Sequence, residues 1–156
     1  MSDCVFCRII RGEIPSAKVY EDGNCYAFLD IGPWSWGHTL VVPKKHREHI
    51  TEMSAAEFAA VSSVIPRIAR AVLEATGAAG LNVLQNNGAV AGQAVAHLHF
   101  HLIPRHEGDG LGYRWNAKRY PAGEMDNYHR KILEALGAKE GGGAPTVSKY
   151  KIIEVK

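Results

Sequence analysis

Three histidines, His97, His99 and His101, alternate with apolar residues in the segment 97–103, HLHFHLI. A period of two is typical of a β-strand, whose successive side chains point to opposite faces of the sheet. The three imidazoles are therefore predicted to share one face, as a row that spans about 13 Å. Because each buried ring costs free energy unless it finds a partner, the row favours a functional site over packing. Its spacing is compatible with metal ligation and with nucleophilic catalysis.

A second group of reactive side chains lies near the start of the chain, where Cys4 and Cys7 form a CxxC pair. Cys25 is the third cysteine, and an odd count without an export signal argues against a disulfide framework. The pair is therefore a candidate metal or redox site, and a redox role is disfavoured because no thioredoxin-like βαβ pattern follows it. Cys25, beside aromatic residues, is predicted to be a small buried hydrophobic residue.

Size and composition limit the class of protein. A chain of 156 residues with 46% hydrophobic and 22% charged residues is expected to form one ordinary globular domain. The formal charge of +2 is too small to indicate a nucleic-acid polymer or a membrane surface as partner. No apolar run approaches a membrane span and no signal-peptide pattern is seen, so we expect a cytoplasmic protein.

The elements that must position these groups are mostly short strands. Strands are predicted at residues 18–20, 25–29, 38–42, 81–85 and 97–103, with a short helix at 5–11 and another at 124–136. One long helix is predicted at 54–76, with Ser54 and Glu57 as a capping box, a kink at Pro66 and a stop at Gly77. Short strands around one long helix indicate an α+β meander. The glycine-rich stretch 141–145 suggests a domain at 1–137 and a tail at 138–156 with a possible extra strand.

These motifs resemble the histidine triad (HIT) superfamily, whose signature, His-φ-His-φ-His-φ-φ with φ apolar, is matched at every position of 97–103. Four further stretches carry the resemblance, which extends from about residue 4 to residue 116: CVFCRIIRGEIPS, AFLDI, GHTLVVPKKH and GQAV. The chain looks most like the small prokaryotic nucleotide-binding branch with an N-terminal CxxC. The resemblance implies a five-stranded antiparallel sheet with one long and one shorter helix. It also implies a homodimer, packed through the 54–76 helix and strand edges.

The resemblance implies a reaction at the α-phosphate of a purine nucleotide derivative. His99 matches the residue that attacks phosphorus and carries a covalent nucleotidyl group. His101 matches the residue that contacts phosphate oxygens and assists the leaving group, and His38 matches a histidine that hydrogen-bonds into the triad. Nucleoside phosphoramidates, dinucleoside polyphosphates and acyl-adenylates are the implied substrates of such a hydrolase or transferase.

Binding residues also follow from the resemblance. Asp30 matches a carboxylate that binds ribose hydroxyls, and Asn86 and Gln93 match amides near the phosphates. The apolar slot for the base is matched by Phe6, Ile14, Phe28 and Ile31. From the residues alone, Asp30 would be a turn or cap residue, and the apolar residues would be core. Relatives often have serine or threonine where this chain has Ala94, so we expect weakened phosphoramidase activity.

A structural zinc ion is implied by the same resemblance, with Cys4, Cys7, His46 and His97 as its ligands. Two cysteines and two histidines form a closed tetrahedral donor set, which is typical of structural rather than catalytic zinc. Such a site would orient His97 away from the nucleophile. His49 is the rival of His46, and the spacing alone does not choose between them.

Two other classes of function stay open at the level of sequence. One is a non-enzymatic nucleotide-binding or zinc-dependent interaction protein, and the other is a metallohydrolase that uses all three triad histidines. The expected partner is an AMP-type ligand in each nucleotide-binding case, with neither a nucleic-acid polymer nor a membrane.

Overall fold

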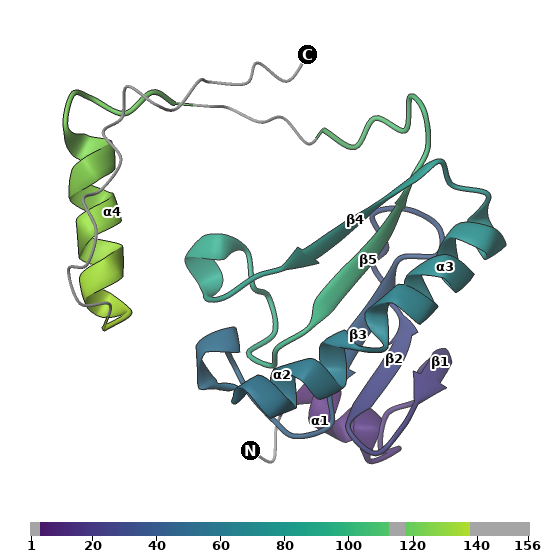
Figure 1. Ribbon diagram of the computed structural model, residues 1–156. Coiled ribbons are helices and arrows are strands. Elements are labelled where there is room, and N and C mark those ends of the chain that lie inside the picture. Colours follow the sequence, from purple (N-terminus) through teal and green to yellow (C-terminus); the bar gives the residue numbers. More distant parts are fainter. Residues whose placement is uncertain (1–3, 113–117, 138–156) are drawn as a thin grey trace. The chain divides into compact units, whose positions relative to one another are not determined.

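The computed structural model describes residues 4–112 and 118–137 and divides the chain into two units, Met1–Leu111 and Gly112–Lys156. The first unit contains a five-stranded antiparallel sheet with the strand order β1-β2-β3-β5-β4 (Figure 1). Its strands are β1 Lys18–Glu21, β2 Cys25–Leu29, β3 Thr39–Pro43, β4 Gly80–Gln85 and β5 Phe100–Arg105. The predicted α+β class and five-stranded antiparallel sheet are confirmed.

The two faces of the sheet are covered by different helices. Helices α2 (Ala55–Ser62) and α3 (Ile65–Thr76) run along one face (Figure 1). There a buried cluster contains Cys25, Ala27, Val41, Val61, Ile68, Val72, Leu98, Phe100 and Leu102. The alternate residues of β2 and β3 pack on the other face against α1 (Val5–Ile10), in a cluster of Phe6, Ile9, Tyr26, Phe28, Leu40 and Val42. The period-two pattern of these strands therefore separates the helical core from the face that carries α1.

Cys25 behaves as predicted, because it is fully buried in the cluster beneath α2 and α3. Burial raises the pKa of its thiol to about 12. The thiol therefore stays protonated at neutral pH and packs as a small hydrophobic group.

The predicted long helix at 54–76 is instead two helices, α2 and α3, separated by a turn at residues 63–64. Pro66 lies in the first turn of α3, where a missing backbone N–H costs little because it has no intrahelical partner. The proline therefore begins a new helix instead of kinking a continuous one. The capping box is present, since the Ser54 hydroxyl accepts from the Glu57 N–H and the Glu57 carboxylate accepts from the Ser54 N–H. Gly77, at φ 62°, ends α3 as predicted.

The histidine strand also begins later than predicted, because β5 starts at Phe100 and leaves His97 and His99 in the irregular segment before it. The register pairs Val41 with Phe100, and its continuation would place Leu98 opposite Pro43. Proline has no N–H to donate to the ladder. The Leu98 N–H bonds instead to the carbonyl of Arg47, at 2.6 Å.

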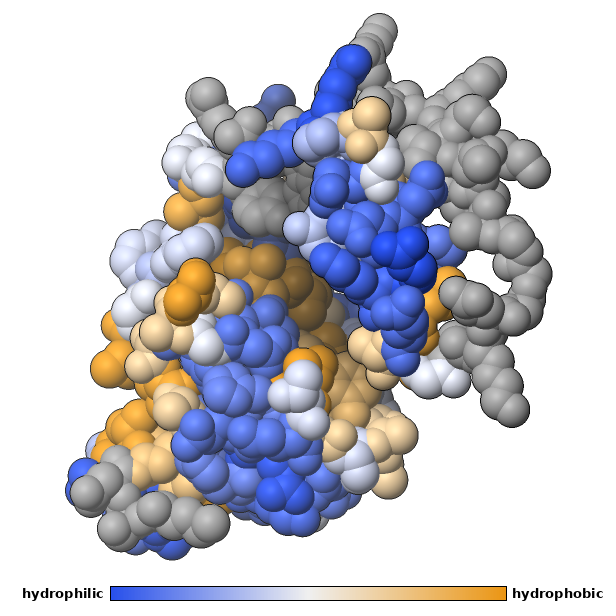
Figure 2. All heavy atoms as spheres, turned by 90° about the vertical axis from the view of Figure 1, so that its left-hand side faces the viewer, coloured by the Kyte–Doolittle hydropathy of each residue, from blue (hydrophilic) through white to orange (hydrophobic). Residues whose placement is uncertain are grey.

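In the second unit the structure describes helix α4 (Glu124–Ala135), close to the predicted 124–136. The predicted tail at 138–156, with its possible strand, lies outside the described residues. Among the described helices, none combines the length and the apolar character needed to cross a membrane. On the face seen in Figure 2, hydrophobic side chains are interspersed with hydrophilic ones.

Candidate functional site

The backbone carbonyl of His97 holds the His99 ring in a single tautomer. Its Nδ1 lies 2.6 Å from the carbonyl oxygen of His97. A carbonyl only accepts, so Nδ1 carries the hydrogen and a neutral ring keeps the lone pair on Nε2. The ring is buried and also contacts the edge of Phe6, with centroids 5.3 Å apart. Nε2, rather than Nδ1, is therefore the ring nitrogen of His99 that is left free, as a nucleophilic imidazole requires.

A second chain of hydrogen bonds fixes the tautomer of His101. The Trp34 backbone N–H donates to His38 Nδ1 at 3.2 Å, so the hydrogen of His38 resides on Nε2. That Nε2–H donates to His101 Nδ1 at 2.9 Å, which leaves His101 with an N–H at Nε2. The His101 ring lies 4.7 Å from the His99 ring, centroid to centroid. An N–H donor is thereby placed next to the His99 ring.

Burial keeps both rings of this relay neutral. Burial lowers the pKa of His38, and the carboxylate of Asp30 opposes that effect in part. Burial lowers the pKa of His101 to about 4, with smaller contributions from neighbouring His99 and His38. At neutral pH each ring therefore has one N–H and one lone pair, which is the state that the relay needs.

Asp30 lies beside this relay, directly after β2. Its Oδ2 is 3.7 Å from His38 Nδ1, and its Oδ1 accepts the Gly32 N–H at 2.8 Å. The side chain is only partly buried. One carboxylate oxygen thus shapes the turn, while the other remains close to the histidines, where a ligand hydroxyl could reach it.

The four apolar residues predicted to hold a base are not all in one place. Phe6 of α1 and Phe28 of β2 are buried in one cluster, in edge-to-face contact with centroids 5.5 Å apart, and the partly buried Ile14 packs against that cluster. Ile31 lies outside the cluster and is fully exposed. The structure therefore brings together three of the four residues.

The predicted amides lie in the loop region between β4 and β5. Asn86 directly follows β4 and is half-buried. Gln93 uses both ends of its amide: Oε1 accepts the Gly88 N–H at 2.6 Å and Nε2 donates to the Glu48 carbonyl at 2.7 Å. Gln93 therefore braces the loop that leads into the histidine segment, and Ala94 follows it in an exposed position.

Cys4, Cys7, His46 and His97 form the candidate metal centre, with one ligand atom from each and all four atoms within 4.8 Å of one another. The His46 and His97 Nδ1 atoms are 3.3 Å apart. The sulfur-to-nitrogen distances are 3.3 Å from Cys4 to His97, 3.5 Å from Cys7 to His97 and 3.4 Å from Cys7 to His46. Tetrahedral zinc bonds imply nitrogens about 3.3 Å apart and sulfur about 3.5 Å from nitrogen. The residues therefore fit a tetrahedral metal ion.

His97 is oriented for this centre by its other ring nitrogen. Its Nε2 donates to the Pro43 carbonyl at 2.8 Å, so Nδ1 presents its lone pair to the two cysteines. Burial lowers the pKa of His97 to about 4, which keeps the ring in the neutral state that binds metal. His49 instead lies beside Glu52, at 3.3 Å, and the structure brings His46 to the cysteines.

Sequence reasoning missed the groups that set the tautomers. They are backbone atoms: the Trp34 N–H and the carbonyls of Pro43 and His97. Backbone groups occur at every position, so no residue type marks them. The contact of Phe6 with both His97 and His99 was also missed. From the sequence, Phe6 was interpreted as a core residue or as part of the apolar slot for the base.

Comparison with known proteins identifies the family. The family model described as HIT domain matches residues 11–108, so the chain belongs to the HIT family. The protein hit of Bacillus subtilis is 45% identical over 139 residues, which cover 87% of this chain and 96% of that protein. The adenylylsulfatase HINT3 of Arabidopsis thaliana is 46% identical over 119 residues, 76% of this chain and 60% of that protein. The adenosine 5′-monophosphoramidase HNT1 of Candida albicans is 37% identical over 140 residues, 86% and 92% of the two chains.

Solved structures share the fold. A crystal structure from Streptococcus mutans superposes with a TM-score of 0.84 at 43% identity and covers 87% of both chains. A zinc-bound histidine triad family protein from Mycobacterium smegmatis has a TM-score of 0.68 at 39% identity, over 88% of this chain and 97% of that chain.

Proposed function

We propose that this protein hydrolyses or transfers the nucleotidyl group of purine nucleotide derivatives, through a covalent intermediate on His99. The observation that carries the proposal is the 2.6 Å hydrogen bond from His99 Nδ1 to the His97 carbonyl, which leaves Nε2 free to act as the nucleophile. Relatives named adenylylsulfatase and adenosine 5′-monophosphoramidase support an AMP-type substrate.

In the first step His99 Nε2 forms a bond to the α-phosphorus, and the bond from phosphorus to the leaving group breaks. The leaving atom keeps the electron pair and takes up a proton, for which the Nε2–H of His101 is the nearby donor. That N–H can also hydrogen-bond a phosphate oxygen as charge develops on it. The His99 Nδ1–H stays on the His97 carbonyl throughout and fixes the plane of the ring.

In the second step water forms a bond to phosphorus and the bond to Nε2 breaks. The products are a nucleoside monophosphate and a neutral His99 with its lone pair restored. One proton of the water passes to His101 Nε2 and replaces the proton that His101 gave to the leaving group in the first step. An acceptor other than water would give nucleotidyl transfer with the same atoms in the same roles.

In this proposal the nucleotide is positioned by the candidate binding residues. Asp30 would accept hydrogen bonds from the ribose hydroxyls, because its Oδ2 lies beside His38 at the end of β2. Ile14, Phe6 and Phe28 would contact the base, and Ile31, which is fully exposed, would cover it from outside. Asn86 would face the phosphates, while Gln93 acts through the loop that it braces.

The same proposal includes a structural zinc ion held by Cys4, Cys7, His46 and His97. When bound, the ion would cross-link the N-terminal helix to the histidine segment and would take no part in bond breaking. The neutral His97 ring and the thiolates of the two cysteines would hold it. His101 lies in a separate group with Asp30 and His38, and His99 belongs to neither group, which disfavours a metallohydrolase that uses all three triad histidines.

A homodimer is a further part of the proposal. Strand β4 lies at one edge of the sheet, and Val83 within it is 48% exposed. An edge strand presents unpaired backbone groups that a second copy could complete. Light scattering on a sizing column would give twice the mass of the chain; a monomer at micromolar concentration would contradict this part.

The experiment that tests the proposed function is hydrolysis of adenosine 5′-phosphoramidate by the wild type and by His99→Asn. We expect turnover by the wild type and a loss of at least about a thousandfold in the variant, because no second nucleophile is aimed at the same point. His49→Asn is the matched control and should keep full activity. AMP binding without turnover by the wild type would instead favour a non-enzymatic nucleotide-binding protein. Ala94 is compatible with this alternative, because it is exposed and has no hydroxyl group to assist the reaction.

A further inference from the structure

An apolar groove runs along the helical face of the sheet, between α3 and the strands β1, β2 and β3. Its volume of about 340 Å³ lies within the range of small-molecule pockets, about 300–1,000 Å³. Val19 and Leu29 line the groove and are 50% and 39% exposed, although their side chains are aliphatic. Ala71 and Ala75 line it from α3, one turn apart, and their short side chains leave space above the strands. A ligand in the groove would therefore remove aliphatic surface from water.

The two ends of the groove differ. At one end Gly37, with φ 92°, lies so close to α3 that a Cβ there would be 2.5 Å from Thr76 Cγ2. This contact between the loop and the helix closes the groove. At the other end the Arg67 guanidinium lies over the ring of Tyr20, 5.6 Å from its centroid. Arg67 and Ala75 are eight residues apart, about 12 Å along the axis of α3. The groove therefore has the length of a short chain, with a cation at its open end.

Arg67 is also the polar side chain that is left free for a ligand. Among the described residues that line the groove it is the only charged one, and no described carboxylate forms an ion pair with it. Thr39 and Thr76 donate their hydroxyl hydrogens to backbone carbonyls, at 2.9 and 2.7 Å. The Tyr20 hydroxyl donates to the Asp22 carboxylate at 3.0 Å. Because these hydroxyls are already used, the body of the groove favours an aliphatic group over a polar one.

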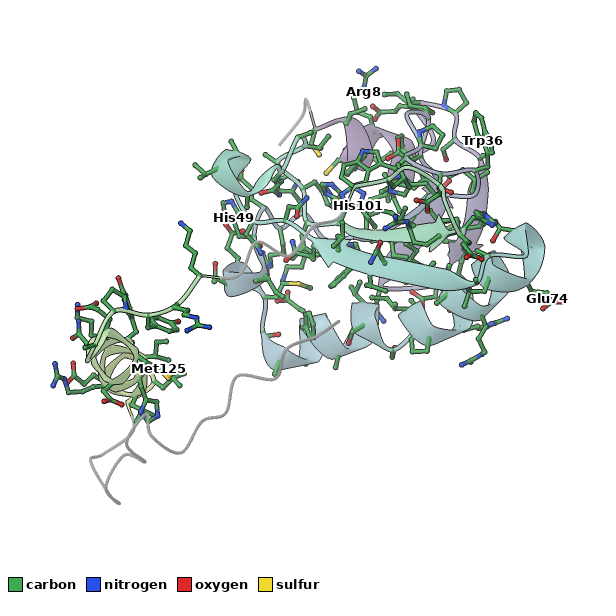
Figure 3. All side chains as sticks on the ribbon, turned by 90° about the horizontal axis from the view of Figure 1, so that it is seen from above. Arg8, Trp36, His49, Glu74, His101 and Met125 are labelled. Atoms are coloured by element: carbon green, nitrogen blue, oxygen red, sulfur yellow. The ribbon has the colours of Figure 1, made fainter. Side chains whose placement is uncertain are left out.

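The groove lies across the sheet from the histidine site. Figure 3 shows His101 on one side of the sheet and helix α3 on the other. Leu29 and Thr39 pair across β2 and β3, and both line the groove. Their chain neighbours, Asp30 and His38, belong to the histidine site. A ligand in the groove would therefore contact the same two strands as the nucleotide without occupying the nucleotide site.

We propose that this groove binds a free aliphatic monocarboxylate, with its carboxylate on Arg67 and its chain along Ala71 towards the closed end at Gly37. A guanidinium presents parallel N–H donors to a carboxylate, and the Tyr20 ring holds the guanidinium in place. At bond lengths of about 1.5 Å and angles near 111°, an extended chain of ten carbons spans about 11 Å, which matches the groove. The site is separate from the proposed function and does not depend on it.

The probe is decanoate, titrated into the full chain by isothermal titration calorimetry. We expect saturable binding to one site, at least about tenfold weaker in Arg67→Gln because the carboxylate loses its charge-assisted hydrogen bonds. Ala71→Leu should weaken binding to a similar extent, since the larger side chain fills the groove. Arg70→Gln, an exposed position of α3 outside the lining, is the matched control and should bind decanoate as the wild type does. Thermal unfolding near that of the wild type shows that each variant is folded.

Three further ligands separate the parts of the proposal. Acetate has the carboxylate without the chain, decanol has the chain without the carboxylate, and each should bind at least about tenfold more weakly than decanoate. AMP should not displace decanoate, because the histidine site lies on the other face. Equal binding by either groove variant, displacement by AMP, or no saturable binding would overturn the proposal. A lower mass of Ala71→Leu by light scattering would show that a second copy of the chain covers the groove, and would also overturn it.

Discussion

The hydrogen-bonded relay from Trp34 through His38 to His101 makes a quantitative prediction for His38. In His38→Phe the ring keeps a similar volume in a buried position, but His101 Nδ1 loses its donor. A neutral hydrogen bond contributes about 1 kcal/mol net. Without the bond from His38, the His101 tautomer with its N–H at Nε2 loses this preference, and the N–H facing the phosphate is no longer fixed. At 1.36 kcal/mol for each factor of ten, kcat/KM should fall about five- to tenfold.

The comparison variant is His38→Gln, whose side-chain amide N–H can donate near the position of the imidazole Nε2–H. It should retain most of the activity that His38→Phe loses. The assay is kcat/KM for adenosine 5′-phosphoramidate, with thermal unfolding to confirm that each variant is folded and ¹⁵N NMR to assign the His101 tautomer. If folded His38→Phe matches the wild type, or if His38→Gln is as impaired as His38→Phe, the relay does not control the reaction.

Three further predictions concern the loop, the metal and pH. Ala94→Ser should raise phosphoramidate turnover several-fold, because a hydroxyl would then be available beside the phosphate; unchanged turnover in a folded variant would contradict it. Protein purified without chelator should contain one zinc per chain by elemental analysis, and Cys4→Ser should lose the zinc and unfold at lower temperature, whereas Cys25→Ser should keep the zinc. The pKa of His101 is lowered to about 4 by burial, so the unfolded chain binds more protons between pH 6.5 and pH 4 and stability should fall as pH drops through that window. Urea unfolding should show a smaller fall in His101→Asn, and an equal fall would contradict this assignment.

Much of the fold could be predicted because the relevant signals are local. The alternation in β2 and β3, the capping box at Ser54 and the stop at Gly77 each depend on a few neighbouring residues. The break between α2 and α3 was missed because Pro66 is compatible with a kink and with a new first turn. Only the packing of both segments on the sheet decides between them.

The start of β5 was misplaced for a related reason. A period of two continues through His97, but the neighbouring strand ends at Pro43, which has no N–H for the ladder. That constraint is set by strand register, which the sequence of one segment does not contain. Departure from the strand is what turns the His97 side chain towards the cysteines and its carbonyl towards His99.

The site residues were predictable as types but not in their orientation. The choice of His46 over His49 depends on where the chain turns after Pro43, and the two histidines are equivalent by type and nearly so by spacing. Trp34 and Trp36 were interpreted from the sequence as part of an ordinary loop, and only the structure shows that His106 and Leu111 line the same hollow. Long-range placement, rather than residue type, decides which side chains meet.

The covalent role of His99 is the central claim, and direct trapping tests it. Protein mixed rapidly with diadenosine tetraphosphate or adenosine 5′-phosphoramidate, quenched in alkali and digested, should yield a peptide that carries one AMP on His99. Mass spectrometry should find this adduct in the wild type and lose it in His99→Asn, with His49→Asn unchanged. Turnover with AMP on a different residue, or rapid turnover with no adduct under conditions that preserve phosphoramidates, would contradict the account.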